Sequence, residues 1–152
     1  MKLYSIICIL FFCELGLAQQ LTWDRTIGDA KELNSPISVL QNGTNYLVIA
    51  SGLLPDEPLT PWIKIYRIDS LGKLIERRLI GKAGESYGAG FANSFLSSND
   101  GGFFICGRYN NNNPDNFMGL LVKLDSMLDT LWTQTYDLGL SNDGFWSAAR
   151  TL

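Results

Sequence analysis

The sequence predicts an all-β protein built from tandem four-stranded antiparallel meanders. The first observation is internal repetition: residues 66–81 and 122–137 lie 56 positions apart and align without a gap. The second is a succession of short runs rich in β-branched and aromatic residues, separated by Gly, Asn, Asp and Pro clusters, which is typical of strands and turns. Helix is poorly supported, because the best candidate, residues 28–35, is short and ends in Asn-Ser before a proline.

The N-terminus has the pattern of an export signal. Lys2 precedes an apolar run at residues 3–12, and the small residues Gly16 and Ala18 have the spacing that signal-peptide cleavage requires. We therefore predict a signal peptide at residues 1–18.

The mature chain, residues 19–152, is then expected to be secreted or extracellular, at the cell surface. A membrane-spanning helix needs about 20 apolar residues, and Glu14 interrupts the run well before that length. Cys13 follows a phenylalanine rather than a small residue, so we expect neither a lipoprotein anchor nor a membrane span.

Composition excludes several kinds of chemistry. The formal charge is −3 and no basic patch is present, which argues against nucleic-acid binding. The chain has no histidine, which removes Ser-His-Asp triads and most zinc and copper sites. Once the signal peptide is removed, Cys106 is the only cysteine, and its apolar surroundings favour a buried thiol over a reactive one. We predict no catalytic residue, no cofactor and no metal site.

The first repeat unit spans about residues 36–81. It has four predicted strands, separated by turns and by an expected loop at residues 52–61. The strands are expected at residues 35–40, 45–51, 62–68 and 74–80.

The second unit spans about residues 92–137, with an expected loop at residues 109–117. Its strands are expected at residues 92–97, 102–108, 118–124 and 130–136. A constant offset of 56 matches Leu40 with Leu96, and Ile49 with Ile105.

The ends of the chain extend the repeat. Residues 21–28 resemble the fourth strand of a unit, and residues 144–152 resemble the start of the second unit, so a third unit begins at about residue 145. A four-stranded sheet repeated at this spacing is typical of β-propeller blades. We predict an incomplete β-propeller of about two blades plus the first strand of a third, whose open edges favour self-association.

Several polar groups were considered as sites. The loop at residues 109–116 is rich in oxygen-bearing side chains that suit calcium, but it lacks the spaced carboxylates of an organised calcium loop. The recurring pairs Asp69-Ser70 and Asp125-Ser126 are expected to fix hairpins by bonding the backbone two residues on. Asn42-Gly43-Thr44 matches a glycosylation sequon, but we expect a hairpin turn there.

The four tryptophans form another candidate, a sugar-stacking platform. Three of them lie inside predicted strands, where packing between units favours a core role. The four are Trp23, Trp62, Trp132 and Trp146.

Residues 99–107, followed by residues 121–126 and Leu131-Trp132, resemble the "DGG-aromatic-I-x-G … KLD … W" repeats of long, exported, propeller-like bacterial proteins that use type IX secretion. The first unit departs from this pattern, with Glu76 where the second has Trp132. The resemblance implies a surface or secreted protein and no particular reaction.

Three functional hypotheses follow. The first is a non-enzymatic repeat module for binding, adhesion or scaffolding, whose partner is a glycan or a cell-surface protein. The second is the N-terminal part of a propeller enzyme acting on polysaccharide, with catalytic residues beyond the chain end. The third is a truncated copy without independent activity.

Overall fold

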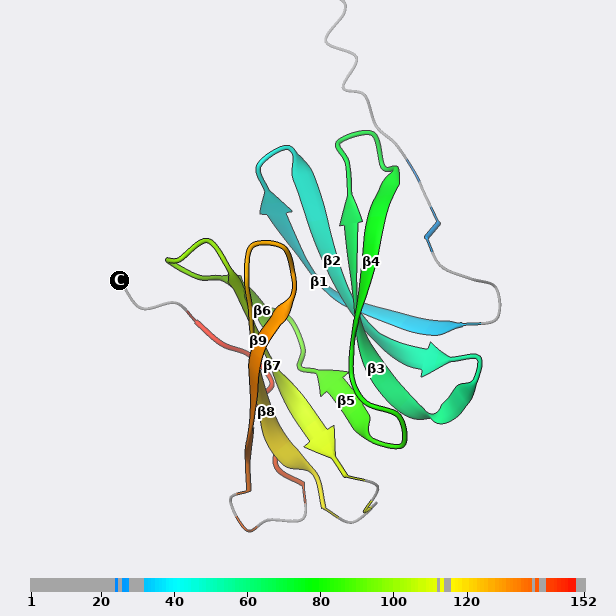
Figure 1. The fold of residues 1–152 in the computed structure, drawn as a ribbon, viewed down its shortest axis with the longest axis vertical. Helices are drawn as coiled ribbons and strands as arrows, with labels where there is room; N and C mark the ends of the chain where they lie inside the picture. The colour runs from blue at the N-terminus through cyan, green and yellow to red at the C-terminus, as the bar shows by residue number, and fades with distance from the viewer. Residues whose placement is uncertain are drawn as a thin grey trace, which may run out of the picture.

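The computed structural model describes residues 24, 26–27, 32–111, 113, 116–137, 139 and 142–149. These residues form two antiparallel sheets and contain no helix (Figure 1). The prediction of an all-β fold is confirmed, whereas the described residues form no closed propeller. The predicted signal peptide at residues 1–18 lies outside the described residues, as does most of the strand expected at residues 21–28.

Sheet one is the first predicted meander. It contains β1 (Leu33–Asn42), β2 (Asn45–Leu54), β3 (Glu57–Ile68) and β4 (Leu74–Ile80), in that spatial order. The expectation that residues 28–35 are a poor helix candidate is confirmed in their described part, because β1 begins at Leu33.

The prediction of a loop at residues 52–61 is wrong, because β2 and β3 continue through most of this segment. Its prolines suggested a loop, yet Pro61 pairs with Leu53 inside the ladder. β4 pairs with β3 only from Ile63 onwards, so β3 is an edge strand at Pro61, where a missing N–H is tolerated. The carboxylate of Glu57 accepts hydrogen bonds of 3.0 Å from the Thr60 hydroxyl and from the indole N–H of Trp62, which hold this end of the hairpin together.

Sheet two contains the second predicted meander and one strand that was not predicted. Its strands are β5 (Ser86–Ala89), β6 (Phe95–Ser97), β7 (Phe103–Asn110), β8 (Met118–Leu124) and β9 (Thr130–Tyr136). β5 and β6 both pair with β7, at different positions along it, so together they form one interrupted first strand.

The interruption between β5 and β6 is a bulge at residues 91–93. Cys106 of β7 brackets it, because its carbonyl accepts from Gly90 N–H and its N–H donates to the Ser94 carbonyl, both at 2.9 Å. Asn93 has a φ of 64° within the bulge. The strand expected at residues 92–97 is therefore reduced to its last three residues.

The hairpins between the third and fourth strands of the two units are near copies. In each, one carboxylate oxygen, from Asp69 or Asp125, accepts from the backbone N–H groups two and four residues on, at 2.8–2.9 Å. The expectation that these aspartates fix the hairpins is confirmed. The ladder shifts register at the same place in both hairpins.

The second strand breaks the constant offset of 56. Ile65 pairs with Ile49, but its counterpart Leu121 pairs with Cys106, so the match of Ile49 with Ile105 is one residue off. The cause is the first turn. Four residues separate the paired positions 41 and 46 in the first unit, whereas five separate positions 97 and 103 in the second.

The third unit expected from about residue 145 forms no strand in its described part, residues 145–149. This segment follows the surface of sheet two instead. The N–H of Phe145 donates to the Gly107 carbonyl at 2.9 Å, and that of Ala148 donates to the Asn93 carbonyl at 3.1 Å.

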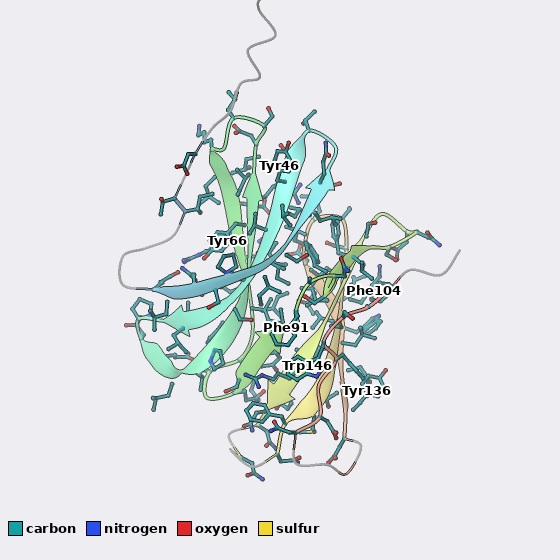
Figure 2. The ribbon with its side chains drawn as sticks, turned by 180° about the vertical axis from the view of Figure 1, so that it is seen from behind. Tyr46, Tyr66, Phe91, Phe104, Tyr136 and Trp146 are labelled. Atoms are coloured by element: carbon teal, nitrogen blue, oxygen red, sulfur yellow. The ribbon has the colours of Figure 1, made fainter. Side chains whose placement is uncertain are left out.

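The two sheets pack face to face around one core, so each has an inner face toward the other sheet and an outer face away from it (Figures 1 and 2). In the third strand of each unit, a shift of 56 positions exchanges these faces. Ile63 and Ile65 lie on the inner face of sheet one, whereas their counterparts Gly119 and Leu121 lie on the outer face of sheet two. The fully buried core residues are Leu47, Ile49, Ile63, Ile65, Ile105, Leu120, Val122 and Leu124.

The buried side chain of Leu128 anchors the hairpin between β8 and β9 to the core. Leu128 has a φ of 67° where the first hairpin has Gly72 at 79°, and its side chain is only 2 % exposed. We expect Leu128→Ala to lower the free energy of unfolding by about 2–4 kcal/mol, because it loses buried apolar contact and keeps the strained backbone. Urea denaturation measures this. Met127→Ala is the control, because Met127 is 59 % exposed and the substitution should cost less than about 0.5 kcal/mol. Equal effects of both substitutions would contradict the assignment.

Candidate binding pocket between the two sheets

A pocket of about 440 Å³ lies at the junction of sheet one, β5 and residues 143–149. Sheet one contributes Ser35 and Ser51, and sheet two with its bulge contributes Phe91 and Arg108. Trp146 closes the pocket from the C-terminal segment.

Stacked aromatic rings form one wall. The ring centroids of Phe91 and Trp146 are 4.9 Å apart, with planes 16° from parallel (Figure 2). The N–H of Phe91 donates to the Trp146 carbonyl at 2.6 Å, which ties the bulge to the C-terminal segment. Gly90 permits this approach, because a Cβ there would lie 2.6 Å from the carbonyl oxygens of Phe145 and Trp146.

Arg108 supplies the charge. Its guanidinium carbon lies 4.7 Å from the ring centroid of Phe117 and 6.0 Å from that of Trp146. Its register partners are Gly88 and Gly119, so no side chain stands beside it on either neighbouring strand. Arg108 is the only charged residue that lines the pocket, and it forms no ion pair with any described residue.

The rest of the pocket lining mixes hydroxyl and apolar side chains. Ser35, Ser51 and Ser86 line it together with Ile37, Leu59 and Pro61. The Ser51 hydroxyl accepts from the N–H of Ala89 at 2.9 Å, which joins sheet one to β5. The pocket therefore combines aromatic faces, one guanidinium and several hydroxyls.

Glu85 joins a separate polar cluster at the start of β5. Its carboxylate accepts from Lys82 at 2.6 Å and from the hydroxyls of Tyr87 and Tyr109 at 3.1 and 2.9 Å. The hydrogen bond from Lys82 is the main cause that lowers the pKa of Glu85. Burial, followed by the bonds to Glu85, raises the pKa of both tyrosines. Both phenols therefore stay neutral donors, and the cluster clamps β5 to β7.

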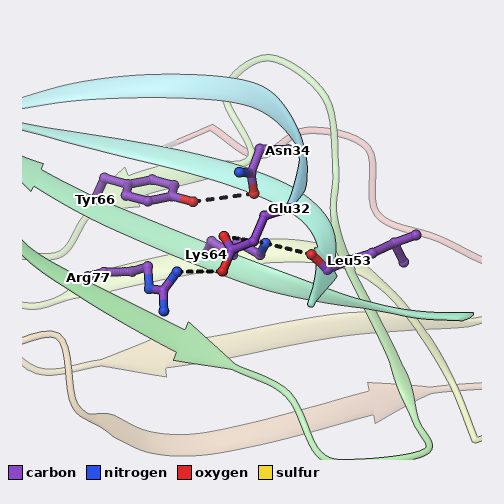
Figure 3. Close-up of polar contacts among 6 residues, drawn as sticks. All are labelled: Glu32, Asn34, Leu53, Lys64, Tyr66 and Arg77. Carbon is purple, nitrogen blue, oxygen red and sulfur yellow. Dashed lines mark hydrogen bonds and ion pairs between the residues drawn. The ribbon is translucent and has the colours of Figure 1, made fainter. Parts of the chain in front are cut away.

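A second network is buried on the outer face of sheet one (Figure 3). The Lys64 ammonium, whose side chain is 0 % exposed, donates to Glu32 at 3.0 Å and to the Leu53 carbonyl at 2.9 Å. Arg77 donates to the other Glu32 oxygen at 2.7 Å. Burial alone would raise the pKa of Glu32, but hydrogen bonds and positive charge from Lys64 and Arg77 lower it overall. Lys64 and Glu32 are thus fully engaged with each other and their neighbours, and the network ties the start of β1 to β3 and β4.

The asparagine-rich loop at residues 109–116 is organised by its own amide. Asn110 is 3 % exposed, and its side-chain nitrogen donates to the carbonyls of Asn113 and Asn116. Two of the loop's carbonyl oxygens thus already accept hydrogen bonds. Within the described part of the chain, no three His, Cys, Asp or Glu side chains gather as a metal site would require.

The tryptophans differ in their positions. Trp62 packs over Gly81 and bonds Glu57, as a packing role predicts, and Trp23 lies outside the described residues. The core role is wrong for Trp132, which is 43 % exposed because it lies on the uncovered outer face of sheet two. Trp146 is similarly exposed, at the pocket.

The remaining candidates agree with the sequence predictions. Cys106 is buried, and burial raises the pKa of its thiol. Gly43 has a φ of 61° in the predicted turn at residues 42–44. Phe91, Arg108 and Phe117 were not predicted as site residues, and no local motif marks them, because only the fold brings them together.

The fold and the pocket thus define a two-sheet all-β protein with an aromatic and cationic surface pocket. Comparisons with known proteins add no relative: no protein family, no curated protein and no solved structure matches the chain. Among the described residues, no helix is long and apolar enough to cross a membrane.

The Glu32 network predicts sensitivity to acid. Because the folded state lowers the pKa of Glu32 from its ordinary 4.5, the carboxylate stabilises the fold above that pH, and this contribution is lost as pH falls further. We expect Glu32→Gln to lower the free energy of unfolding by about 3–5 kcal/mol at neutral pH, because Lys64 stays buried without its counter-charge.

Urea denaturation between about pH 6 and about pH 3 measures both effects. Glu32→Gln should show a smaller loss of stability on acidification than the unsubstituted chain. Asp129→Asn is the control, because Asp129 is 64 % exposed and lies 3.9 Å from Arg78. Equal pH dependence in the unsubstituted chain and Glu32→Gln would refute the role of Glu32.

Proposed function

We propose that this chain is a non-enzymatic, glycan-binding repeat module of an exported, propeller-like protein, acting in adhesion or scaffolding. The observation that carries the proposal is the pocket wall made by Phe91 and Trp146, which are 66 % and 44 % exposed although each is a large apolar ring. Small-ligand pockets are mostly apolar, with a few placed polar groups. The pocket has this composition.

The wall suits a sugar ring. The C–H faces of a pyranose are apolar and flat enough to pack on an aromatic ring, while its hydroxyls need polar partners. The serine hydroxyls in the pocket lining and Arg108 offer those partners. Aromatic faces, hydroxyls and a guanidinium are groups that recognise a sugar, which supports a binding role.

The packing of the two sheets supports a repeat array. The exchange of faces at a 56-residue shift means that a third unit placed on sheet two would repeat the contact between sheets one and two. The C-terminal segment begins such a repetition. The N–H of Ala89 donates to the Ser51 hydroxyl in the first contact, and the N–H of Phe145 donates to the backbone carbonyl of Gly107, so each bond joins the following segment to the second strand of the preceding sheet.

Glycan binding is tested by applying the purified full chain to an array of plant and microbial polysaccharides. We expect retention without release of reducing ends. Trp146→Ala should reduce binding at least about tenfold, because the bound sugar ring loses its contact with one aromatic face. Trp132→Ala is a matched control at 43 % exposure and should leave binding unchanged.

Binding to no glycan would overturn the proposal. Release of reducing ends would instead favour a polysaccharide-active enzyme. Equal effects of the two tryptophan substitutions would show that the pocket is not the glycan-binding site.

The repeat array predicts association through the outer face of sheet two. Phe104 and Trp132 lie there with ring centroids 6.0 Å apart, and Leu121 lies beside them. Sedimentation velocity should show association that grows with concentration, and the double substitution Phe104→Ser with Trp132→Ser should weaken it. Leu33→Ser is the control, because Leu33 is 69 % exposed on β1. A monomer at every concentration would contradict the array.

A further inference from the structure

We infer that the pocket takes an acidic sugar, a uronic acid whose carboxylate pairs with Arg108 while its ring packs against the Phe91–Trp146 wall. This inference deepens the proposed glycan binding and rests on it.

The first step is the unpaired charge. The chain carries a formal charge of −3, yet no carboxylate lines this pocket and Arg108 pairs with no described acid. The described acids that form ion pairs lie outside the pocket lining. They are next to or within sheet one, at Glu85 or in hairpin turns. Among the described residues, Arg108 is therefore the one charged side chain in the pocket lining, which favours an anionic ligand.

The second step is the position of the guanidinium. Its carbon lies over the Phe117 ring at 4.7 Å and near the Trp146 ring at 6.0 Å. Arginine can contact an aromatic ring and still present a planar fork of N–H donors to a ligand. Those donors match the two oxygens of a carboxylate in a bidentate pair.

The third step is the distribution of polar groups. Ser35, Ser51 and Ser86 stand in the same pocket as the rings and Arg108. A uronic acid offers a carboxylate, an apolar ring face and several hydroxyls in one residue. An acidic peptide offers the carboxylate without the hydroxyls, and a neutral sugar offers the hydroxyls without the carboxylate.

The fourth step is preorganisation. Phe145 packs over Gly119, where a Cβ would lie 2.9 Å from its ring, and against Tyr136 with ring centroids 5.4 Å apart. This contact fixes the backbone that carries Trp146. A site whose walls are already ordered spends less free energy on binding.

Isothermal titration calorimetry of the full chain tests the inference with trigalacturonate and its fully methyl-esterified form, which carries neutral methyl esters in place of the carboxylates. We expect the acid to bind about ten- to a hundredfold more tightly than the ester. Arg108→Gln should remove that preference, and Arg108→Lys should restore only part of it, because lysine lacks the planar fork. Arg78→Gln is the control, because the Arg78 side chain is 41 % exposed away from the pocket.

The results distinguish failure of the acidic-sugar inference from failure of glycan binding itself. Equal affinity for acid and ester, with Trp146 still required, overturns the acidic-sugar inference and leaves glycan binding standing. Binding of neither sugar, together with an empty glycan array, overturns both. Triglutamate that binds as tightly as trigalacturonate, and through Arg108, overturns the sugar in favour of an acidic peptide.

Discussion

The structure depends on the apolar contact between the inner faces of its two sheets. Ile49 and Ile65 of sheet one meet Ile105 and Val122 of sheet two in a common core, and all four are 0 % exposed. A single small sheet buries too little apolar surface to be stable alone. The contact therefore stabilises both sheets, and it also places β5 beside sheet one, where the pocket forms.

If each repeat unit packs one face on the unit before it and the other on the unit after it, both faces of a sheet must be apolar. This explains why the central strands do not alternate cleanly between polar and apolar residues. β8 presents Leu120 and Val122 to the core and Gly119 and Leu121 to the outer face, so both faces are apolar. The one cation in the strand, Lys123, is kept at its end by Asp100 at 2.7 Å and by the Phe104 ring. That hydrogen bond is the main reason that the pKa of Asp100 falls to about 2.

Sequence reasoning succeeded where turn chemistry is local and failed where it is not. The bounds of β4, β8 and β9 are correct to the residue, since each begins after an aspartate-fixed hairpin turn or a loop rich in asparagine. β5 was missed because Ser86–Ala89 has little strand propensity and pairs only through β7. The one-residue error at Ile49 arose because turn length does not appear in an ungapped alignment. The pocket was missed because its residues, from Ser35 to Trp146, are far apart in the chain.

The bulge in the first strand shows how one repeated unit could acquire a site that the other lacks. Both units interrupt the first strand at the same place, opposite Ala50 and Ile49 in sheet one and opposite Gly107 and Cys106 in sheet two. Sheet one inserts only Ile37, which packs partly on the core. Sheet two inserts residues 91–93, which cannot all fit in the ladder, so Phe91 is displaced to the surface, where it stacks on Trp146. Bulges re-aim side chains without disturbing the flanking pairs. The ladder holds the flanking residues in place, and the irregular residues form the aromatic wall of the pocket, so the same core supports one unit with a nearly continuous first strand and one with a pocket wall.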